Sequence, residues 1–133
     1  MRALYMYIGI AGAAGALSRY GVGILTDSFA PASVVPLATL LCNFTGSFIL
    51  GWVTGGGAAR LRLPDKGKIA LTSGFVGSYT TFSTFSMETV RMTEDGRYGQ
   101  ALLYVLVSLW GGLLLAWLGV KSGERLLRRG ARS

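Results

Sequence analysis

The stretch of sequence that decides the fold is Gly74-Phe75-Val76-Gly77-Ser78-Tyr79-Thr80-Thr81-Phe82-Ser83-Thr84-Phe85-Ser86-Met87-Glu88. It lies in an apolar segment, residues 69–90, yet seven of the nine residues from Ser78 to Ser86 carry a hydroxyl group. Glycine and β-branched threonine both disfavour a straight helix. We therefore predict a membrane-spanning helix that is interrupted near Gly77–Thr81, close to the middle of the bilayer. Non-helical backbone at that depth must be buried in protein or line a cavity.

The composition of the whole chain is that of a membrane protein. Of its 133 residues, 51% are hydrophobic and 14% are charged, whereas a soluble domain carries about 25% charged residues. The mean hydropathy is +0.49. Four stretches are long and apolar enough to cross the bilayer as helices, namely 4–25, 34–55, 69–90 and 98–120. Short breaks separate them, so we predict a single all-α domain, 1–133, of four antiparallel transmembrane helices. The first stretch lacks a clean signal-peptide cleavage site, and we expect it to be retained.

The basic residues indicate the orientation. Four spans place both termini and the loop between the second and third spans on one side. That side holds ten of the 13 basic residues, and the other side holds Arg19, Arg91 and Arg97. Because cytoplasmic ends carry the excess of Lys and Arg, we expect both termini in the cytoplasm and a multi-pass protein of the cell (inner) membrane. Charge that is clustered between apolar runs favours contact with lipid headgroups over binding of nucleic acid.

Enzymatic chemistry has few candidate groups. The chain has no His and one Cys, Cys42, and most of its six acidic residues lie in predicted loops. This excludes disulfide frameworks, Cys/His zinc sites and His-based acid–base catalysis. We therefore expect that the protein is not an enzyme. Many of its 20 glycines fall inside the spans. Such small faces either pack the helices of one chain together or join two chains, and we expect self-association into a dimer or a larger assembly.

Neutral polar and aromatic groups recur inside the spans. Phe82 and Phe85 share a helix face, where they either pack in a core or present electropositive ring edges to an anion. Two further pairs, four residues apart, also share faces: Thr39 with Asn43, and Tyr104 with Ser108. These polar groups either join helices or form a ladder of uncharged donors. Many weak neutral donors suit a small anion that must enter and leave again.

The backbone carbonyls that the predicted interruption frees could be satisfied in two ways. These carbonyls belong to Gly77 and Thr80, and a small hard cation such as Na⁺ would satisfy them. Alternatively, water or a side chain caps the kink. Charged residues lie near the ends of the spans, as Arg19 and Glu88 do, and none lies in the middle of one.

At these residues the sequence resembles the fluoride channel family named Fluc or CrcB. The resemblance rests on three motifs: residues 74–88, Leu37-Ala38-Thr39-Leu40-Leu41-Cys42-Asn43-Phe44-x-Gly46, and Gly12-x-x-Gly15-Ala16-x-x-Arg19-Tyr20. It implies an antiparallel, dual-topology dimer with two fluoride pores, a structural Na⁺ at its centre, and export of cytoplasmic fluoride that lowers its toxicity. The implied pore residues are Phe82, Phe85, Asn43, Ser108, Tyr104, Thr39 and Ser83. The resemblance further implies vestibule roles for Arg19 and Glu88, and Na⁺ coordination by the carbonyls of Gly77 and Thr80.

Three departures from the family pattern bear on these expectations. Ala38 and Ser78 stand where glycine is common, and Gly112 stands where a pore hydroxyl is common. The ten-to-three bias of basic residues opposes insertion in both directions. Either this rule is overridden in the chain and its partner is a second copy, or the partner is an oppositely inserted paralogue. Two other classes remain open: a small multidrug-type exporter, which needs a carboxylate within the membrane, and a non-transporting membrane assembly subunit.

Overall fold

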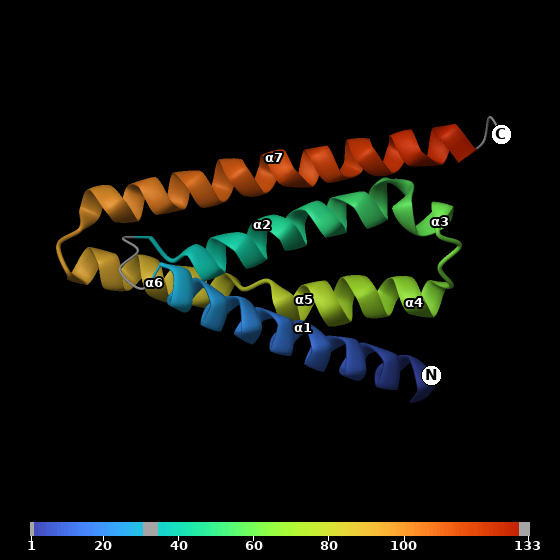
Figure 1. Ribbon diagram of the computed structural model, residues 1–133, viewed down its shortest axis with the longest axis horizontal. Helices are drawn as coiled ribbons and strands as arrows, with labels where there is room; N and C mark the ends of the chain where they lie inside the picture. The colour runs from blue at the N-terminus through green and yellow to red at the C-terminus, as the bar shows by residue number, and fades with distance from the viewer. Residues whose placement is uncertain (1, 31–34, 131–133) are drawn as a thin grey trace.

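The computed structural model describes residues 2–30 and 35–130, with side chains as far as Arg128 (Figure 1). Within these ranges the chain is helical and contains no strand, which confirms the predicted all-α class. The elements are α1 (Arg2–Phe29), α2 (Leu37–Trp52), the π-helical turn η1 (Val53–Gly57), α3 (Ala58–Arg60), α4 (Asp65–Ile69), the π-helical segment η2 (Ala70–Val76), α5 (Gly77–Tyr79), α6 (Phe82–Glu94) and α7 (Tyr98–Gly130).

Three helical stretches are long and apolar enough to cross a membrane: Arg2–Phe29, Leu37–Arg60 and Tyr98–Arg128. The predicted spans 4–25 and 98–120 lie inside the first and last of them. The first residue of the predicted span 34–55, Val34, lies outside the described residues. Helix α1 continues through Asp27, where the sequence predicted a break, and α7 continues ten residues beyond the predicted end of its span.

The third predicted span is divided into two pieces. Residues 65–79 form one helical rod from α4, η2 and α5, and α6 begins at Phe82. Between them Thr80 (φ −83°, ψ 158°) and Thr81 (φ −149°, ψ 123°) are extended. The interruption predicted near Gly77–Thr81 is therefore confirmed, although Gly77 itself is still helical.

The helices run back and forth between two ends of the molecule. The N-terminus of α1, the link between α3 and α4, and the C-terminal end of α7 lie at one end, while the turn between α6 and α7 lies at the other (Figure 1). The described basic residues on both sides of that link and in the last turns of α7 therefore gather at the same end, as four antiparallel segments require.

Small residues let the helices approach closely. A Cβ at Gly119 or Gly51 would collide with the backbone of the facing helix, so α2 and α7 pack backbone to backbone. A Cβ at Gly15 would likewise collide with the backbone of Phe75. Helices α1 and η2 are therefore also in close backbone contact. Close contact through small residues is a common mode of helix association in membranes.

Gly46 of α2 leaves space for the extended residues of the third segment. A Cβ at this position would overlap the Cγ2 atom of Thr80. Thr80 cannot turn away freely, because its hydroxyl group donates a hydrogen bond to the carbonyl of Val76 (2.9 Å). The absence of a side chain at Gly46 therefore lets α2 lie directly against the extended residues Thr80 and Thr81.

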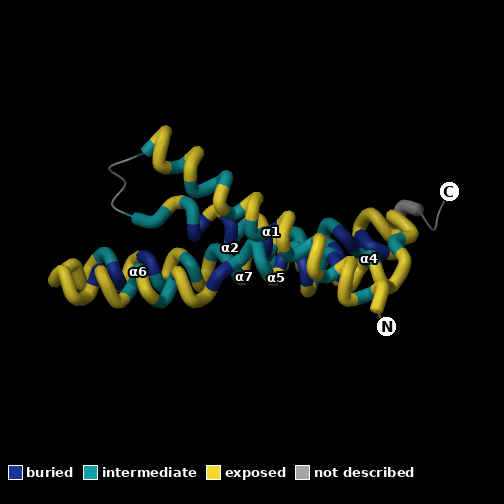
Figure 2. The backbone as a smooth tube through the Cα atoms, turned by 90° about the horizontal axis from the view of Figure 1, so that it is seen from below, coloured by how far each residue is buried: buried dark blue, intermediate teal, exposed yellow. Residues whose placement is uncertain are grey.

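Large apolar side chains remain exposed along the long helices. Figure 2 shows exposed stretches on each of them, with buried residues where helices meet. Tyr104, Val53 and Cys42 are the largest side chains that are fully buried among the described residues. An apolar exterior around such a small core is expected for a chain that contacts lipid or further protein.

Candidate functional site

Asn43 of α2 holds the extended backbone of the broken segment. Its Nδ2 donates to the carbonyl oxygen of Thr81 (3.0 Å), and the amide of Thr81 donates to its Oδ1 (2.8 Å). Both backbone groups of Thr81 are thereby satisfied without a helical partner. This pairing explains why an asparagine, costly in a membrane segment unless bonded, is present in α2. One Nδ2 hydrogen remains for a further acceptor.

Thr81 also begins the second half of the segment. Its Oγ1 accepts a hydrogen bond from the amide of Thr84 (3.1 Å), which is the N-cap arrangement of a helix. The same oxygen donates to the hydroxyl of Thr84 (2.9 Å) and lies 3.3 Å from the hydroxyl of Ser83. Ser83, predicted as a pore residue, therefore lies beside this cap and is exposed.

The first half of the segment ends with a freed carbonyl. The amide and the hydroxyl of Thr80 both donate to the carbonyl of Val76 (3.0 and 2.9 Å). The amide of Thr81 would bond the carbonyl of Gly77 in a continuous helix, but it bonds Asn43 instead. Gly77 is exposed on this chain. The break thus presents a backbone acceptor on an uncovered face.

Two clefts adjoin the break. The first, about 290 Å³, lies between α2, α6 and α7 and is lined by Asn43, Ser47, Phe82, Phe85, Val105, Ser108, Leu109 and Gly112. The second, about 300 Å³, lies against the extended residues and is lined by Asn43, Gly46, Ser47, Leu50, Val76, Thr80, Thr81 and Phe82. They share Asn43, Ser47 and Phe82. None of the residues that line either cleft is charged.

The first cleft brings together four of the predicted pore residues: Asn43, Phe82, Phe85 and Ser108. The hydroxyl oxygen of Ser108 is buried and forms no hydrogen bond. Buried polar groups are nearly always bonded, so the unbonded hydroxyl of this cleft-lining residue is a candidate donor for a ligand.

Ser47 was missed by the sequence reasoning. It lies four residues after Asn43, so helical spacing alone would have placed it on the same face of α2. A Cβ at Gly112 of α7 would lie 3.9 Å from its Oγ. Ser47 therefore supplies a hydroxyl group opposite the position where Gly112 provides none.

The aromatic rings of the site form a connected row. The Phe82 and Phe85 ring centroids are 5.8 Å apart with an interplanar angle of 43°, and those of Phe85 and Tyr104 are 5.2 Å apart with an angle of 49°. These tilted contacts direct ring edges toward neighbouring groups. Phe82 remains 79% exposed on the single chain, so much of its surroundings must come from outside the chain.

Glu88 joins three helices at the far end of the row. The hydroxyl of Thr39 in α2 donates to its Oε1 (2.9 Å), and the hydroxyl of Tyr104 in α7 donates to its Oε2 (2.7 Å). Tyr104 is fully buried. The predicted residues Thr39, Tyr104 and Glu88 are therefore one hydrogen-bonded cluster, adjacent to the row of rings through the Phe85–Tyr104 contact.

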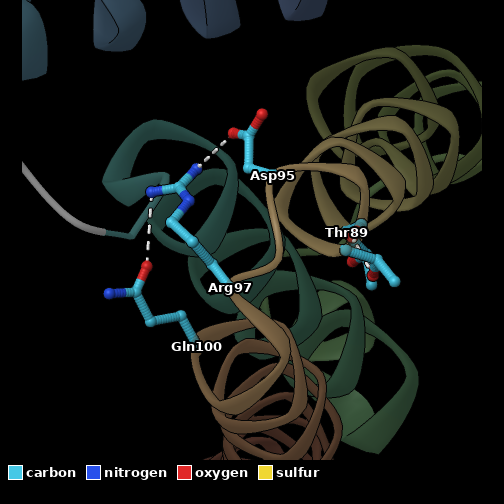
Figure 3. A network of polar contacts seen from close by, with 5 residues as sticks. Thr89, Asp95, Arg97 and Gln100 are labelled. Atoms are coloured by element: carbon cyan, nitrogen blue, oxygen red, sulfur yellow. Dashed lines mark hydrogen bonds and ion pairs between the residues drawn. The ribbon is translucent and has the colours of Figure 1, made fainter.

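A third cleft, about 250 Å³, borders Glu88 and is also lined by Asp27 and Arg97. Arg97 follows the turn at Gly96, whose φ of 73° favours glycine. Its guanidinium donates to Asp95 (3.3 Å) and to Gln100 (3.2 Å), as Figure 3 shows. Arg19, the other predicted vestibule residue, is half-buried in α1 and does not line any of these three clefts.

Long apolar helices around a broken polar segment define a multi-pass helical membrane protein. Comparison with known proteins assigns the family: the model described as "CrcB-like protein, Camphor Resistance (CrcB)" matches residues 6–120, and the chain belongs to this family. Relatives named as ion channels agree with the expectation that the chain is not an enzyme.

Three relatives illustrate the similarity. A protein of Geobacillus kaustophilus named "Fluoride-specific ion channel FluC 2" is 48% identical over 121 residues, covering 91% of this chain and 93% of its own. "Fluoride-specific ion channel FluC 1" of Bacillus thuringiensis is 44% identical and covers 95% and 91% of the two chains. A FluC 1 protein of Desulfitobacterium hafniense is 48% identical and covers 84% and 96%.

Replacing Asn43 tests its role at the break. We expect Asn43→Leu to leave both backbone groups of Thr81 without partners, at a cost of about 1–3 kcal/mol for each group that stays buried. Hydrogen–deuterium exchange of a peptide containing Thr81 should become faster. Thr54→Val, which removes a hydroxyl bonded within its own helix, is the control and should leave this exchange unchanged. Equal exchange in Asn43→Leu and the parent chain would contradict the assignment.

Proposed function

We propose that this chain is a passive, fluoride-selective channel. The observation that carries the proposal is the first cleft, where Asn43, Ser108 and the rings of Phe82 and Phe85 meet without a charged residue. The names of the relatives, fluoride-specific ion channels, support it. The pore residues are Phe82, Phe85, Asn43, Ser108, Tyr104, Thr39 and Ser83, to which we add Ser47.

The proposed mechanism is exchange of water for weak neutral partners. A dehydrated fluoride ion accepts hydrogen bonds from the free Ser108 hydroxyl and the remaining Nδ2 hydrogen of Asn43, and it contacts the electropositive ring edges of Phe82 and Phe85. No lysine or arginine in these clefts holds the anion. Binding at several weak sites lets the ion enter and also leave.

The proposed assembly is an antiparallel, dual-topology dimer of single four-span domains. Residues 65–94 form the third span as two half-helices that meet at Thr80–Thr81. The exposed ring of Phe82 and the exposed Gly77 support a second chain on this face, because a freed carbonyl facing lipid would be costly. The second chain is either a copy of this one or an oppositely inserted paralogue.

We further propose that Na⁺ binds at the centre of this dimer. The donors are the backbone carbonyls of Gly77 and Thr80, and the lost helical partner of the Gly77 carbonyl fits this role. The described residues include no cluster of three or more His, Cys, Asp or Glu side chains, so backbone oxygens are the donors this region offers. The positive charge of the ion would stabilise the backbone carbonyls that the break leaves without helical partners.

In the cell, such a channel would lie in the inner membrane and release cytoplasmic fluoride down its gradient, which lowers fluoride toxicity. For a chain inserted in the direction that its charge favours, the gathering of basic residues at one end supports a cytoplasmic location of both termini. Arg19 would serve the aqueous vestibule and Glu88 the far end of the pore, where Glu88 lines a cleft with charged neighbours.

Fluoride efflux from liposomes tests the function. Vesicles that contain the purified protein should release fluoride, measured with an ion-selective electrode, and retain chloride. Phe82→Ile should abolish efflux while leaving assembly intact, because an aliphatic side chain has no electropositive edge. Phe29→Ile, at the exposed end of α1, is the matched control and should conduct normally.

Other outcomes of the same assay would reject the proposal. Equal release of chloride would contradict selectivity for fluoride. Proton-coupled uptake of a cationic dye would identify an exporter. A well-folded protein without flux would indicate an assembly subunit.

Removing Na⁺ tests the proposed cation site. A ligand that binds the folded state raises its stability, so replacing Na⁺ by N-methylglucamine should lower the thermal midpoint of the purified protein. Tryptophan fluorescence measures that midpoint. K⁺ at the same ionic strength should not restore it, because a small, hard cation is required. Identical midpoints in all three salts would contradict a sodium site.

A further inference from the structure

Helix α7 is longer than a membrane crossing requires. Its 33 residues extend about 50 Å at 1.5 Å per residue, whereas a hydrocarbon core of about 30 Å needs about 20 residues. If Tyr98 lies near one boundary, the residues after Val120 lie beyond the other. This last part carries Lys121, Arg125 and Arg128, so it places charge on a rigid helix at the level of the lipid headgroups.

A cleft of about 570 Å³ lies at this boundary, between α2 and the end of α7. Phe48, Trp117 and Leu118 form its apolar side, and Lys121, Arg125 and Arg128 form its cationic side. Its volume is within the range of small-ligand sites. It shares no lining residue with the two clefts at the break, so it is a separate feature of the molecule.

The order of residues along the cleft matches a membrane interface. Lys121, Arg125 and Arg128 recur at helical spacing, so they share one face of α7. Trp117 lies one turn before Lys121 on that face, and tryptophan is enriched at the boundary between lipid tails and headgroups. The cleft therefore passes from an apolar wall to a cationic one along the helix, as the boundary itself does.

The cleft has an excess of positive charge. Its one carboxylate, Glu124, lies 3.9 Å from the Nζ of Lys121, and both side chains are partly exposed. Arg125 and Arg128 form no ion pair within the described part of the chain. Two guanidinium groups beside an apolar wall are suited to bidentate contact with a phosphate group.

We propose that this cleft binds an anionic phospholipid. The headgroup phosphate contacts Arg125 and Arg128, and Lys121 lies one helical turn closer to the lipid tails. The first part of an acyl chain lies along Phe48, Trp117 and Leu118. Phe48, Trp117 and Leu118 are exposed on the chain, and these apolar side chains beside the cations favour a lipid over free phosphate. The site is independent of the proposed fluoride pathway, since it needs neither the broken segment nor a second chain.

Quenching of Trp117 fluorescence by brominated lipid tests the proposal. The full chain is reconstituted in phosphatidylcholine vesicles that contain a minor fraction of brominated phosphatidylglycerol or, separately, brominated phosphatidylcholine. The contribution of Trp117 is the difference between the parent chain and Trp117→Phe. We expect stronger quenching by the anionic lipid. Equal quenching by the two lipids would overturn the proposal.

A matched pair of variants distinguishes lipid binding in this cleft from a general effect of the protein's net charge. Replacing Lys121, Arg125 and Arg128 by Gln should reduce the preference for the anionic lipid by about fivefold per charge. The same replacement of Arg60, Arg62 and Lys66 removes equal charge from the same end and should leave the preference intact. Equal loss in both variants would show a general surface effect and reject the site.

Two further measurements complete the test. Arg128→Gln alone, on an exposed side chain, should give about a fivefold loss even if the triple variant folds poorly. Excess inorganic phosphate should leave the quenching by brominated phosphatidylglycerol unchanged. Complete displacement by phosphate would show that the cleft is a site for free phosphate. Fluoride flux is not a readout here, so failure of this proposal and failure of the channel function are distinguishable.

Discussion

The structure around the candidate pathway depends on the pairing of one side-chain amide with one extended residue. Asn43 satisfies both backbone groups of Thr81, which allows the third segment to leave the helical conformation inside an apolar layer. Gly46, one turn further along α2, gives Thr80 the space to lie against that helix. The break then frees the carbonyl of Gly77 and starts α6 with Phe82 beside the cleft. Without this pairing, two backbone groups would lie unbonded within the membrane, at a cost that favours a continuous helix.

The two clefts at the break have no charged lining residue, and this gives the proposed pathway its chemical character. Their polar groups are the amide of Asn43 and the hydroxyls of Ser47, Ser108, Thr80 and Thr81. The carboxylate of α6 beyond the row of rings, Glu88, accepts hydrogen bonds on both oxygens, from the hydroxyls of Thr39 and Tyr104. In the function proposed above, these neutral donors would hold a small anion weakly enough for it to pass. Phe82 is largely exposed, so a second chain or lipid would complete the lining around it.

Much of this arrangement could be predicted from residue type and spacing. The dense hydroxyl run after Gly77 predicted the break, and the pairs Thr39–Asn43 and Tyr104–Ser108 identified helix faces that do meet. Spacing could not assign partners, so the bonds from Asn43 to Thr81 and from Tyr104 to Glu88 came from the structure. The helical state of Asp27 and the extension of α7 past Val120 were also missed, because polar residues end the apolar pattern without ending the helix. Ser47 was overlooked although its spacing from Asn43 was visible.

The central claim is that uncharged donors beside the broken segment carry fluoride, and the unbonded hydroxyl of Ser108 tests it most directly. Fluoride efflux from liposomes should be measured for Ser108→Ala and for Ser18→Ala, whose hydroxyl is bonded within α1. Loss of one neutral hydrogen bond of about 1 kcal/mol predicts efflux about fivefold slower for Ser108→Ala and unchanged for Ser18→Ala. Parental efflux in Ser108→Ala, with the protein folded, would contradict the account.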